Sequence, residues 1–293
     1  MRKCEHFSDL HLHKGGDSLE QILEAAKKSG KKVVSVVDKE SIDHIRQLEE
    51  CCKKYDLVYV RGVEVNARYE NKVYHFLVYN FRRQDMLKRL LKKEVKAKRE
   101  RALKVAKKLE KMGWVINWKI LLEKPDYLLG RKMIVNNIFS NPANEDRLLR
   151  EGIFTRDDFY CAYLNFGQPA YFARKVLSVS FLIKTAHKAG GVVVWAHPVR
   201  TICEHFKKIR LNGEFMSVFT ALKNAGIDGV EVYYPGVTEE QISFLCHLCR
   251  KYNLFITAGS DSREKKLIKI PKLVDGCLPD DIRYQSSLYR GVS

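Results

Sequence analysis

The sequence predicts an α/β barrel, and three observations support this prediction. β-branched runs typical of buried parallel strands, such as residues 32–37 and 192–196, recur along the chain and alternate with amphipathic helical patterns. Once one lysine-rich helical stretch is set aside, about seven strand–helix units remain, which favours a barrel over an open sheet. Polar side chains close most of the predicted strands, as expected where barrel strands end at a common rim.

The predicted elements begin with a strand that ends in Ser8-Asp9-Leu10-His11-Leu12-His13. A helix follows over 18–29, because Ser18 and Gln21 have the spacing of a capping box and Gly30 provides a stop. Further strands are predicted over 32–37, 58–65 and 72–79, with a helix over 42–55 between the first two.

From Phe81 onward the pattern changes. Residues 82–112 form a helical pattern dense in Lys and Arg, and shorter helical patterns without strand alternation continue beyond it. We therefore expect a helical insertion subdomain over 83–168, within a discontinuous barrel domain made of 1–82 and 169–293. After the insertion, the predicted helices are 178–189, 214–225 and 238–252, and the predicted strands are 192–196, 228–233 and 254–258.

Composition narrows the classes of function. The chain has 293 residues, 45% of them hydrophobic, and a formal net charge of +18. This charge favours polyanionic partners such as nucleotides or RNA, although a lysine-rich solvated surface explains it equally well. No apolar run is long enough to cross a membrane, and residues 1–6 lack the apolar stretch of a signal peptide. The eight cysteines show no framework spacing, and Cys246-His247-Leu248-Cys249 lies in a helical pattern, so we expect reduced thiols and a cytoplasmic protein.

The segment around His11 and His13 is the first candidate site. Residues two apart on a strand point to the same face, so both rings can face one metal ion. Asp9 shares that face and could ligate the ion or accept a histidine ring N–H. The alternative is a pair of histidines on an ordinary strand. The rest of the chain favours a metal site, because similar polar groups close other strands: Asp38, Glu64, His75, His197 and Asp261. Histidines with carboxylates suit Zn, Mn or Fe, and several carboxylates suggest more than one ion.

These residues, in this order, resemble the motifs of the PHP (polymerase and histidinol phosphatase) phosphoesterases. The matching segments are Asp9-Leu10-His11-Leu12-His13, Val37-Asp38-Lys39, Gly62-Val63-Glu64-Val65, His75, Ala196-His197-Pro198 and Gly259-Ser260-Asp261-Ser262-Arg263. The resemblance covers nearly the whole chain and implies a distorted (β/α)7, TIM-like PHP barrel with metal ions at its rim. The helical insertion, with Gly130-Arg131 and Ala170-Tyr171-Phe172-Ala173-Arg174, resembles the subgroup that acts on nucleoside 3′,5′-bisphosphates, nucleotide monophosphates and RNA 5′ ends.

The resemblance also implies which residues hold metal. One ion would be held by His11, His13, Glu64 and Asp261, and a second by Glu64, His75 and His197. A third ion would use Asp17, which lies one residue closer to His13 than is usual in the family, together with two histidines that this chain replaces by Lys39 and Arg263.

The two replacements fall on the same implied metal site. Lysine and arginine are cations at neutral pH and poor metal ligands there. We therefore expect two divalent ions (Mn, Zn or Fe) and a lost third site. Lys39 and Arg263 would supply the positive charge of the missing ion, with Asp17 as their salt-bridge partner. The alternative is that the third site has decayed and activity with it.

The expected activity is metal-dependent hydrolysis of phosphate esters of nucleotides or RNA 5′ ends, through a hydroxide shared by two metal ions. The expected catalytic residues are Lys39, Arg263 and Asp9. Arg131, Arg174 and Lys175 are candidates for contacts to a second phosphate or to the nucleotide backbone. One alternative is a catalytically weakened protein that binds nucleotides or RNA. Another is a metallohydrolase of C–N bonds, which the Gly-Val-Glu and Gly-Ser-Asp segments fit less well.

Overall fold

The structure is a computed structural model that describes residues 8–15, 17–124, 126, 129–202, 213–263 and 269–271. The segment 1–6, considered above for a signal peptide, lies outside the described residues. The chain divides into two compact units. The first comprises residues up to Arg89 and from Leu177 onward, and the second comprises Leu90–Val176.

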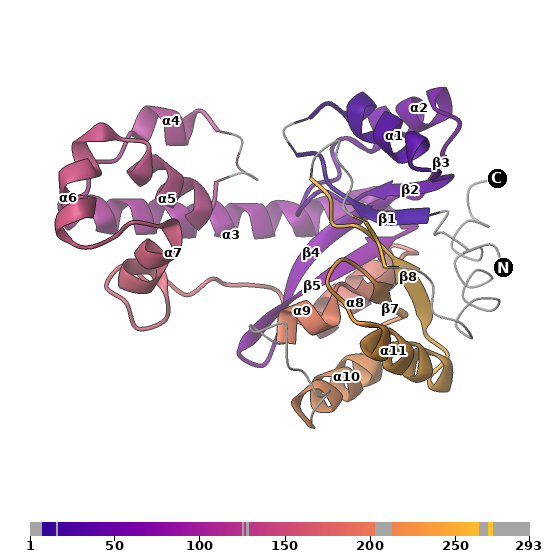
Figure 1. Cartoon of the computed structure of the whole chain (residues 1–293). Helices are drawn as coiled ribbons and strands as arrows, with labels where there is room; N and C mark the ends of the chain where they lie inside the picture. Colours follow the sequence, from indigo (N-terminus) through magenta and orange to yellow (C-terminus); the bar gives the residue numbers. More distant parts are fainter. Residues whose placement is uncertain are drawn as a thin grey trace. The chain divides into compact units, whose positions relative to one another are not determined.

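One sheet of the first unit contains three parallel strands in the order β1-β2-β3. Its strands are β1 (Ser8–Leu12), β2 (Val33–Val36) and β3 (Val58–Tyr59), connected by helices α1 (Leu19–Lys28) and α2 (Ile45–Lys54) (Figure 1). The capping box predicted for α1 is present, since Ser18 accepts from the Gln21 N–H and the Gln21 side chain accepts from the Ser18 N–H. Buried leucine and isoleucine side chains along one face of α1 place it on the core.

The second sheet has the order β4-β5-β6-β7-β8. Its strands are β4 (Gly62–Tyr69), β5 (Lys72–Tyr79), β6 (Val192–Trp195), β7 (Gly229–Tyr233) and β8 (Phe255–Ala258). Helices α8 (Val179–Lys188), α9 (Pro198–Ile202), α10 (Gly213–Ala225) and α11 (Glu239–Lys251) precede or separate its later strands in the chain (Figure 1). Both strand pairs that involve β5 are antiparallel, whereas β6, β7 and β8 pair in parallel.

The predicted strand over 58–65 is two strands in the structure. The chain leaves the first sheet after β3 and enters the second at Gly62. A Cβ at Gly62 would collide with Val37 and Tyr79, so the close approach at this crossing requires glycine. No helix separates β4 from β5, because a tight turn at Glu70, with φ 49°, connects them directly as an antiparallel hairpin. Regular strand–helix alternation is therefore interrupted at this point.

Two isolated β-bridges connect the first sheet, or the residues that follow its strands, with the second sheet or the residues that follow its strands. Leu12 at the end of β1 pairs with Ser262 beyond β8, and Lys39 beyond β2 pairs with Glu64 on β4. The His13 N–H also donates to the Ser262 carbonyl at 2.9 Å, and the Glu40 N–H donates to the Glu64 carbonyl. These contacts bring the end of β1 to the segment after β8, and the segment after β2 to β4. The fold is thus a mixed α/β arrangement of two sheets and helices.

The second unit is helical in all of its described secondary structure. Helix α3 (Gln84–Lys111) begins in the first unit and continues into the second, which also contains α4 (Trp118–Leu122), α5 (Arg131–Phe139), η2 (Pro142–Asn144), α6 (Glu145–Arg150), α7 (Arg156–Phe159) and η3 (Tyr160–Leu164). Its core is built around Trp114, Phe159 and Tyr163, whose rings pack on one another. The sequence placed this insertion at 83–168, whereas the compact unit runs from Leu90 to Val176.

The described cysteines are all free thiols: Cys51, Cys52, Cys161, Cys246 and Cys249. Cys246 and Cys249 are buried in α11, which agrees with a packing role for that pair. Burial raises the pKa of Cys52 to about 12, so its thiol stays protonated at neutral pH. Within the described residues, no helix combines the length and apolar character needed to cross a bilayer.

Candidate metal centre

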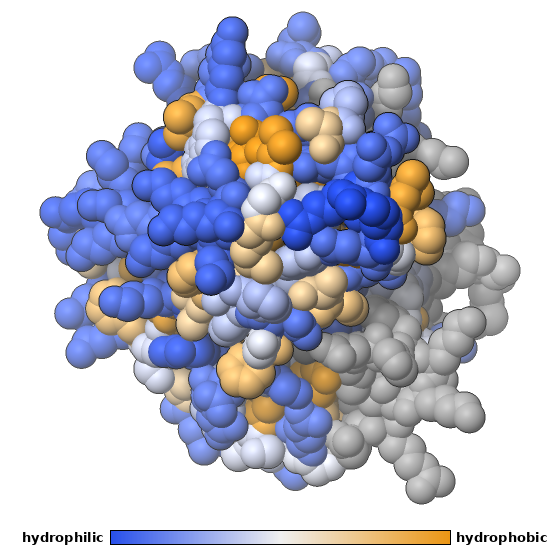
Figure 2. Space-filling model, turned by 90° about the vertical axis from the view of Figure 1, so that its left-hand side faces the viewer, coloured by the Kyte–Doolittle hydropathy of each residue, from blue (hydrophilic) through white to orange (hydrophobic). Residues whose placement is uncertain are grey.

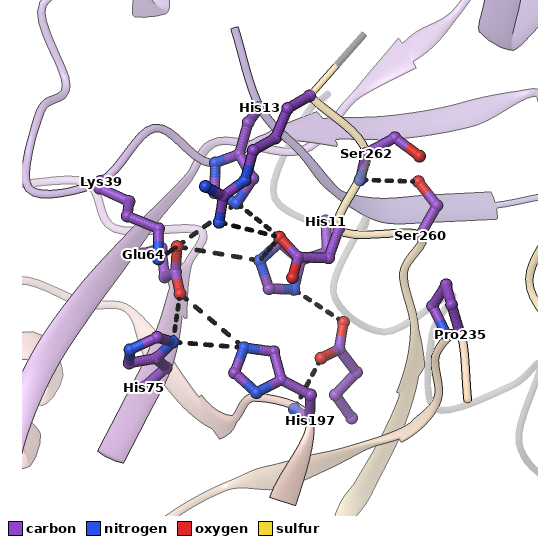
Figure 3. A network of polar contacts seen from close by, with 12 residues as sticks. His11, His13, Lys39, Glu64, His75, His197, Pro235, Ser260 and Ser262 are labelled. Atoms are coloured by element: carbon purple, nitrogen blue, oxygen red, sulfur yellow. Dashed lines mark hydrogen bonds and ion pairs between the residues drawn. The ribbon is translucent and has the colours of Figure 1, made fainter. Parts of the chain in front are cut away.

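The first unit brings the predicted histidines and carboxylates to one cluster (Figure 3). Two histidines come from the end of β1, at positions two residues apart whose rings point to the same side, as strand geometry requires. The remaining members come from β4, β5 and the segments that follow β6 and β8. The cluster comprises His11, His13, Glu64, His75, His197 and Asp261.

One half of the cluster surrounds Glu64 Oε2 and Asp261 Oδ1. His13 Nε2 lies 3.3 Å from Glu64 Oε2 and 3.0 Å from Asp261 Oδ1. His11 Nε2 lies 4.0 Å and 3.7 Å from the same two oxygens. Two imidazole nitrogens and two carboxylate oxygens therefore converge on one point.

The other half surrounds the second oxygen of the same glutamate. His75 Nδ1 lies 2.8 Å from Glu64 Oε1, and His197 Nε2 lies 3.9 Å from it. The two ring nitrogens are 3.3 Å apart. Glu64 thus presents one oxygen to each half of the cluster, from a position that is almost fully buried.

The donor set fits metal ions. His11 Nε2, His13 Nε2, both oxygens of Glu64 and Asp261 Oδ1 are buried and make no well-formed hydrogen bond to any described residue. Buried polar atoms rarely stay unsatisfied, and here they lie within reach of one another. Ligand atoms of His11, Glu64 and His197, and likewise of His11, His13 and Asp261, lie within 4.8 Å of one another. Imidazole nitrogens with carboxylate oxygens are the donors that Zn, Mn and Fe accept.

The electrostatics of the cluster keep its carboxylates charged. Burial alone would raise the pKa of Glu64, but contacts with the rings of His197 and His75 and the charge of Lys39 hold that pKa well below its usual value. The pKa of Asp261 is also lowered, because contacts with His13 and His11 outweigh its burial. Burial lowers the pKa of His197, which favours the neutral ring that binds metal.

Two members of the cluster have left-handed backbone conformations. His197 has φ 29° and Asp261 has φ 49°. Non-glycine residues in this region carry strain of roughly 1–3 kcal/mol, which surrounding contacts must hold in place. At these two positions the direction of the side chain is obtained at the cost of an unfavourable backbone conformation.

Among the described residues, three with cationic side chains border the cluster. Lys39 Nζ lies 3.2 Å from Glu64 Oε2, and Arg263 Nη2 lies 3.7 Å from Asp261 Oδ1. The sequence did not single out the third, Arg200, which follows the His197-Pro198 segment on α9. Arg200 Nη1 forms an ion pair with Asp261 Oδ2, and its Nη2 donates to the Pro235 carbonyl at 3.3 Å. Only its position three residues after His197 could have drawn attention to it.

Asp9 accepts hydrogen bonds from backbone groups. Its Oδ1 accepts the backbone N–H groups of His11 and Ser260, at 3.2 Å and 3.0 Å. Burial raises the pKa of Asp9. This carboxylate connects the β1 backbone to the segment after β8, and the catalytic role expected of Asp9 stays a prediction.

The other predicted carboxylates near the cluster have distinct positions. Asp38 Oδ1 accepts the Lys14 N–H at 2.9 Å, and burial raises the pKa of Asp38. Asp17 lies between β1 and α1, directly before the helix cap. The contacts shown for Lys39 and Arg263 go to Glu64 and Asp261, and the role expected of Asp17 stays a prediction.

The residue that does hold a histidine ring is Glu231 on β7. Its Oε1 lies 2.9 Å from His11 Nδ1, and its Oε2 accepts the His197 N–H at 2.7 Å. Sequence reasoning missed Glu231, although a signal was present: Gly62-Val63-Glu64-Val65 recurs as Gly229-Val230-Glu231-Val232. Both segments place a glutamate in an otherwise apolar strand.

The predicted phosphate-contacting residues belong to the second unit. Arg131 Nη1 donates to the Leu164 carbonyl, and Arg174 Nη2 lies 3.8 Å from Glu94. Lys175 is exposed. Arg101, on α3, is near this group: burial and repulsion from Arg131 lower its pKa to about 10. The arginine and lysine side chains of this group outnumber the one carboxylate shown beside them, Glu94, and such side chains can bind a phosphate.

Most of the chain is similar to known proteins, in sequence or in fold. No family model matches it. It is 26% identical over 260 residues to a 5′-3′ exoribonuclease of Haemophilus influenzae, covering 86% of this chain and 88% of that protein.

Two solved structures have a similar fold. A protein of Bifidobacterium adolescentis, assigned as a metal-dependent phosphoesterase, has a TM-score of 0.71 and 24% identity, covering 98% of this chain and 96% of that one. An amidohydrolase of Chromobacterium violaceum, crystallised with sulfate and no metal, has a TM-score of 0.74 and 18% identity, with 96% of each chain covered.

Proposed function

We propose that this protein is a metal-dependent phosphoesterase of the PHP type that hydrolyses phosphate esters of nucleotides or RNA 5′ ends. Support comes from the cluster of histidines and carboxylates, from the similar fold of a protein assigned as a metal-dependent phosphoesterase, and from the exoribonuclease relative. The single observation that carries the proposal is Glu64, which is buried and offers one oxygen to each half of the cluster. This is the arrangement expected of a carboxylate that bridges two metal ions.

In this proposal two divalent ions, Mn, Zn or Fe, would be held by the two halves of the cluster. The ligands of one would be His11, His13, Glu64 and Asp261, and those of the other Glu64, His75 and His197. When bound, the ions would polarise the phosphate and supply a nucleophilic hydroxide at neutral pH. The third ion of the resembling family would be absent, since Lys39 and Arg263 take the positions of two of its ligands.

The side chains of the chain itself would bind and orient the phosphate. Lys39 and Arg263 border the cluster and would offset charge that develops on the transferred phosphoryl group. Arg200 would hold Asp261 in place through its ion pair. Arg131, Arg174 and Lys175 would contact a second phosphate or the nucleotide backbone.

Metal content and phosphate release test this function directly. The purified chain is treated with EDTA, reloaded with Mn²⁺, Zn²⁺ or Fe²⁺, and assayed on AMP, a 3′,5′-bisphosphate and a 5′-phosphorylated RNA oligomer. About two ions per chain with turnover on at least one substrate is the expected result. If the protein neither binds metal nor releases phosphate with any of the three metals, the proposal that it is a metal-dependent phosphoesterase is refuted.

A binding protein without turnover is the second candidate, and one contact favours it. Lys39 Nζ lies 3.2 Å from Glu64 Oε2, so a permanent cation already neutralises part of the charge that would attract a metal ion. A protein of this kind would bind the RNA oligomer in the presence of EDTA and release no phosphate. The panel above separates the two candidates.

RNA as a substrate draws support from a row of exposed lysines on α3. Figure 2 shows one face of the molecule, on which hydrophilic residues predominate between smaller apolar patches. The lysines of the row are Lys92, Lys93, Lys96, Lys104, Lys107, Lys108 and Lys111, and none of them forms an ion pair with a described residue. Basic residues elsewhere on the same helix are paired, as in Arg89 with Asp85 and Arg99 with Asp126. Like charges four residues apart, such as Lys104 and Lys108, cost roughly 0.2–0.5 kcal/mol per pair in a helix. A polyanion would relieve this repulsion.

Reversing part of this lysine row is expected to weaken RNA binding. The variant carries Lys104→Glu, Lys107→Glu and Lys111→Glu, and its control carries Lys53→Glu, Lys184→Glu and Lys188→Glu, with the same change in net charge. A plot of log affinity against log salt concentration has a negative slope. If each lysine of the row contacts a phosphate, this slope becomes less steep by roughly two to three in the first variant. Equal slopes for both variants, measured by fluorescence anisotropy, would rule out the row as an RNA contact. Hydrolysis of AMP stays unchanged in both.

Metal affinity is expected to rise with pH. Contacts with Glu231 outweigh burial and raise the pKa of His11 from 6.5 to about 9 in the metal-free protein. The protonated ring therefore contributes stability that is complete below pH 6.5 and lost as the pH rises through 9. A metal ion must displace this proton, so affinity should increase roughly tenfold per pH unit over that interval. Calorimetric titration of Mn²⁺ in buffers of different ionisation enthalpy checks this by detecting about one released proton, and a pH-independent affinity would contradict it.

A further inference from the structure

Glu231 is the buried carboxylate of the site that neither the proposed ligand sets nor the proposed phosphate contacts include. It lies on β7, where every residue is buried, and it is almost fully inaccessible to solvent. Among the described residues, neither lysine nor arginine forms an ion pair with it, since the nearby Arg200 is directed to Asp261. A charged carboxylate in such a place is costly unless its surroundings make use of it.

Both oxygens of Glu231 contact the histidine cluster, one in each half. Oε1 lies 2.9 Å from the ring Nδ1 of His11, and Oε2 accepts the backbone N–H of His197 at 2.7 Å. When the His11 ring is neutral, the first contact holds its proton on Nδ1, so that the lone pair is on Nε2, which is directed at Glu64 and Asp261.

The contact to His197 acts on the backbone. His197 adopts φ 29°, a left-handed conformation that a histidine rarely takes. A charged acceptor at 2.7 Å from its N–H gives a strong hydrogen bond that offsets part of this strain. The same carboxylate therefore contacts two histidines that are distant in sequence, one at its ring and one at its backbone.

The packing around Glu231 leaves little freedom for other arrangements. A Cβ at Gly259 would collide with both His11 and the Glu231 carboxylate. The pairing of β7 with β8 shifts register between Glu231 and Tyr233. Irregular pairing of this kind redirects side chains, and here it occurs beside the cluster.

We propose that Glu231 is a positioning residue that couples the two halves of the metal centre, by fixing the proton of His11 on Nδ1 and by holding the backbone of His197. The inference rests on the proposed metal-dependent function for its effect on metal affinity. The position of the His11 proton is independent of that function and can be measured in the metal-free protein.

Glu231→Gln tests the proposal, because glutamine keeps the size of the side chain but offers one acceptor and one donor. The glutamine oxygen is expected to accept from the His197 N–H, because an NH₂ group at that place would face another donor. The NH₂ group then faces His11 Nδ1 and can only donate to it, which requires the ring proton on Nε2. The control is Glu240→Gln, an exposed glutamate on α11. Glu231→Asp, which keeps both acceptors, is the second variant should the glutamine protein be poorly folded.

Two measurements decide the outcome. Calorimetric titration of the EDTA-treated protein with Mn²⁺ is expected to show a 10- to 100-fold loss of affinity in Glu231→Gln, little change in the control and partial recovery in Glu231→Asp. Nitrogen-15 spectra of the metal-free protein, recorded where the His11 ring is neutral, are expected to show the proton on Nδ1 in the natural protein and on Nε2 in Glu231→Gln.

An unchanged His11 proton position in Glu231→Gln would overturn the proposal whether or not metal binds. Unchanged Mn²⁺ affinity, with the natural protein binding normally, would overturn it as well. If the natural protein binds no metal while the proton moves as expected, the proposed function fails and the positioning role of Glu231 stands.

Discussion

Glu64→Gln is expected to abolish phosphate release and to lower the metal content of the protein by at least one ion per chain. One carboxylate serves both halves of the cluster, with Oε2 near His13 and Oε1 near His75. An amide offers a single neutral acceptor oxygen, so at most one half keeps its ligand and the negative charge that holds two cations together is lost. We expect a fall in kcat of at least about 10³-fold, because the loss acts on the whole reacting centre.

The measurements for Glu64→Gln are metal content by mass spectrometry and phosphate release from the best substrate of the panel. Glu70→Gln serves as the control, since Glu70 lies on the same hairpin at its exposed turn. Thermal unfolding in EDTA checks that the variant is folded. A folded Glu64→Gln protein that keeps two ions and normal turnover would show that Glu64 has no part in the reaction.

Lys39→Met is expected to reduce kcat by about 10²–10³-fold, the usual cost of losing one charged group that stabilises a transition state. Among the described residues, Lys39 is the lysine or arginine nearest to the Glu64 carboxylate, at 3.2 Å from Oε2, and methionine retains most of its length without its charge. Metal content should stay at the natural level or rise, because a competing cation is removed. Lys53→Met, on the surface of α2, is the control.

The same reasoning extends to the third metal site that we propose to be absent. Lys39→His combined with Arg263→His restores the two ligand types that the resembling family has, and the metal content should then increase. A fall in kcat for Lys39→Met would indicate that Lys39 acts on the phosphate. An unchanged metal count in the double histidine variant would show that these two substitutions do not restore a third metal site. Normal kcat in Lys39→Met, by contrast, would exclude Lys39 from catalysis.

Local structure followed closely from the sequence where neighbouring residues decide it. The predicted capping box at Ser18 is present, because it depends on hydrogen bonds between residues three apart. The hairpin of β4 and β5 was not predicted as a direct turn, since two apolar runs separated by a few polar residues fit either a hairpin or a crossover. The antiparallel pairing of β5 with both β4 and β6 decides between these, and β6 lies far along the chain.

The sequence by itself determined which side chains could form a metal centre. Histidines two residues apart at the end of β1, and further histidines and acidic residues in or after other strands, made up the predicted cluster. Only the tertiary structure decided how these members are held: Glu231 contacts the ring of His11, Asp9 accepts backbone N–H groups, and Arg200 pairs with Asp261. The physical reason is that a hydrogen bond acts over about 3 Å, and strands distant in sequence bring the partners within that range.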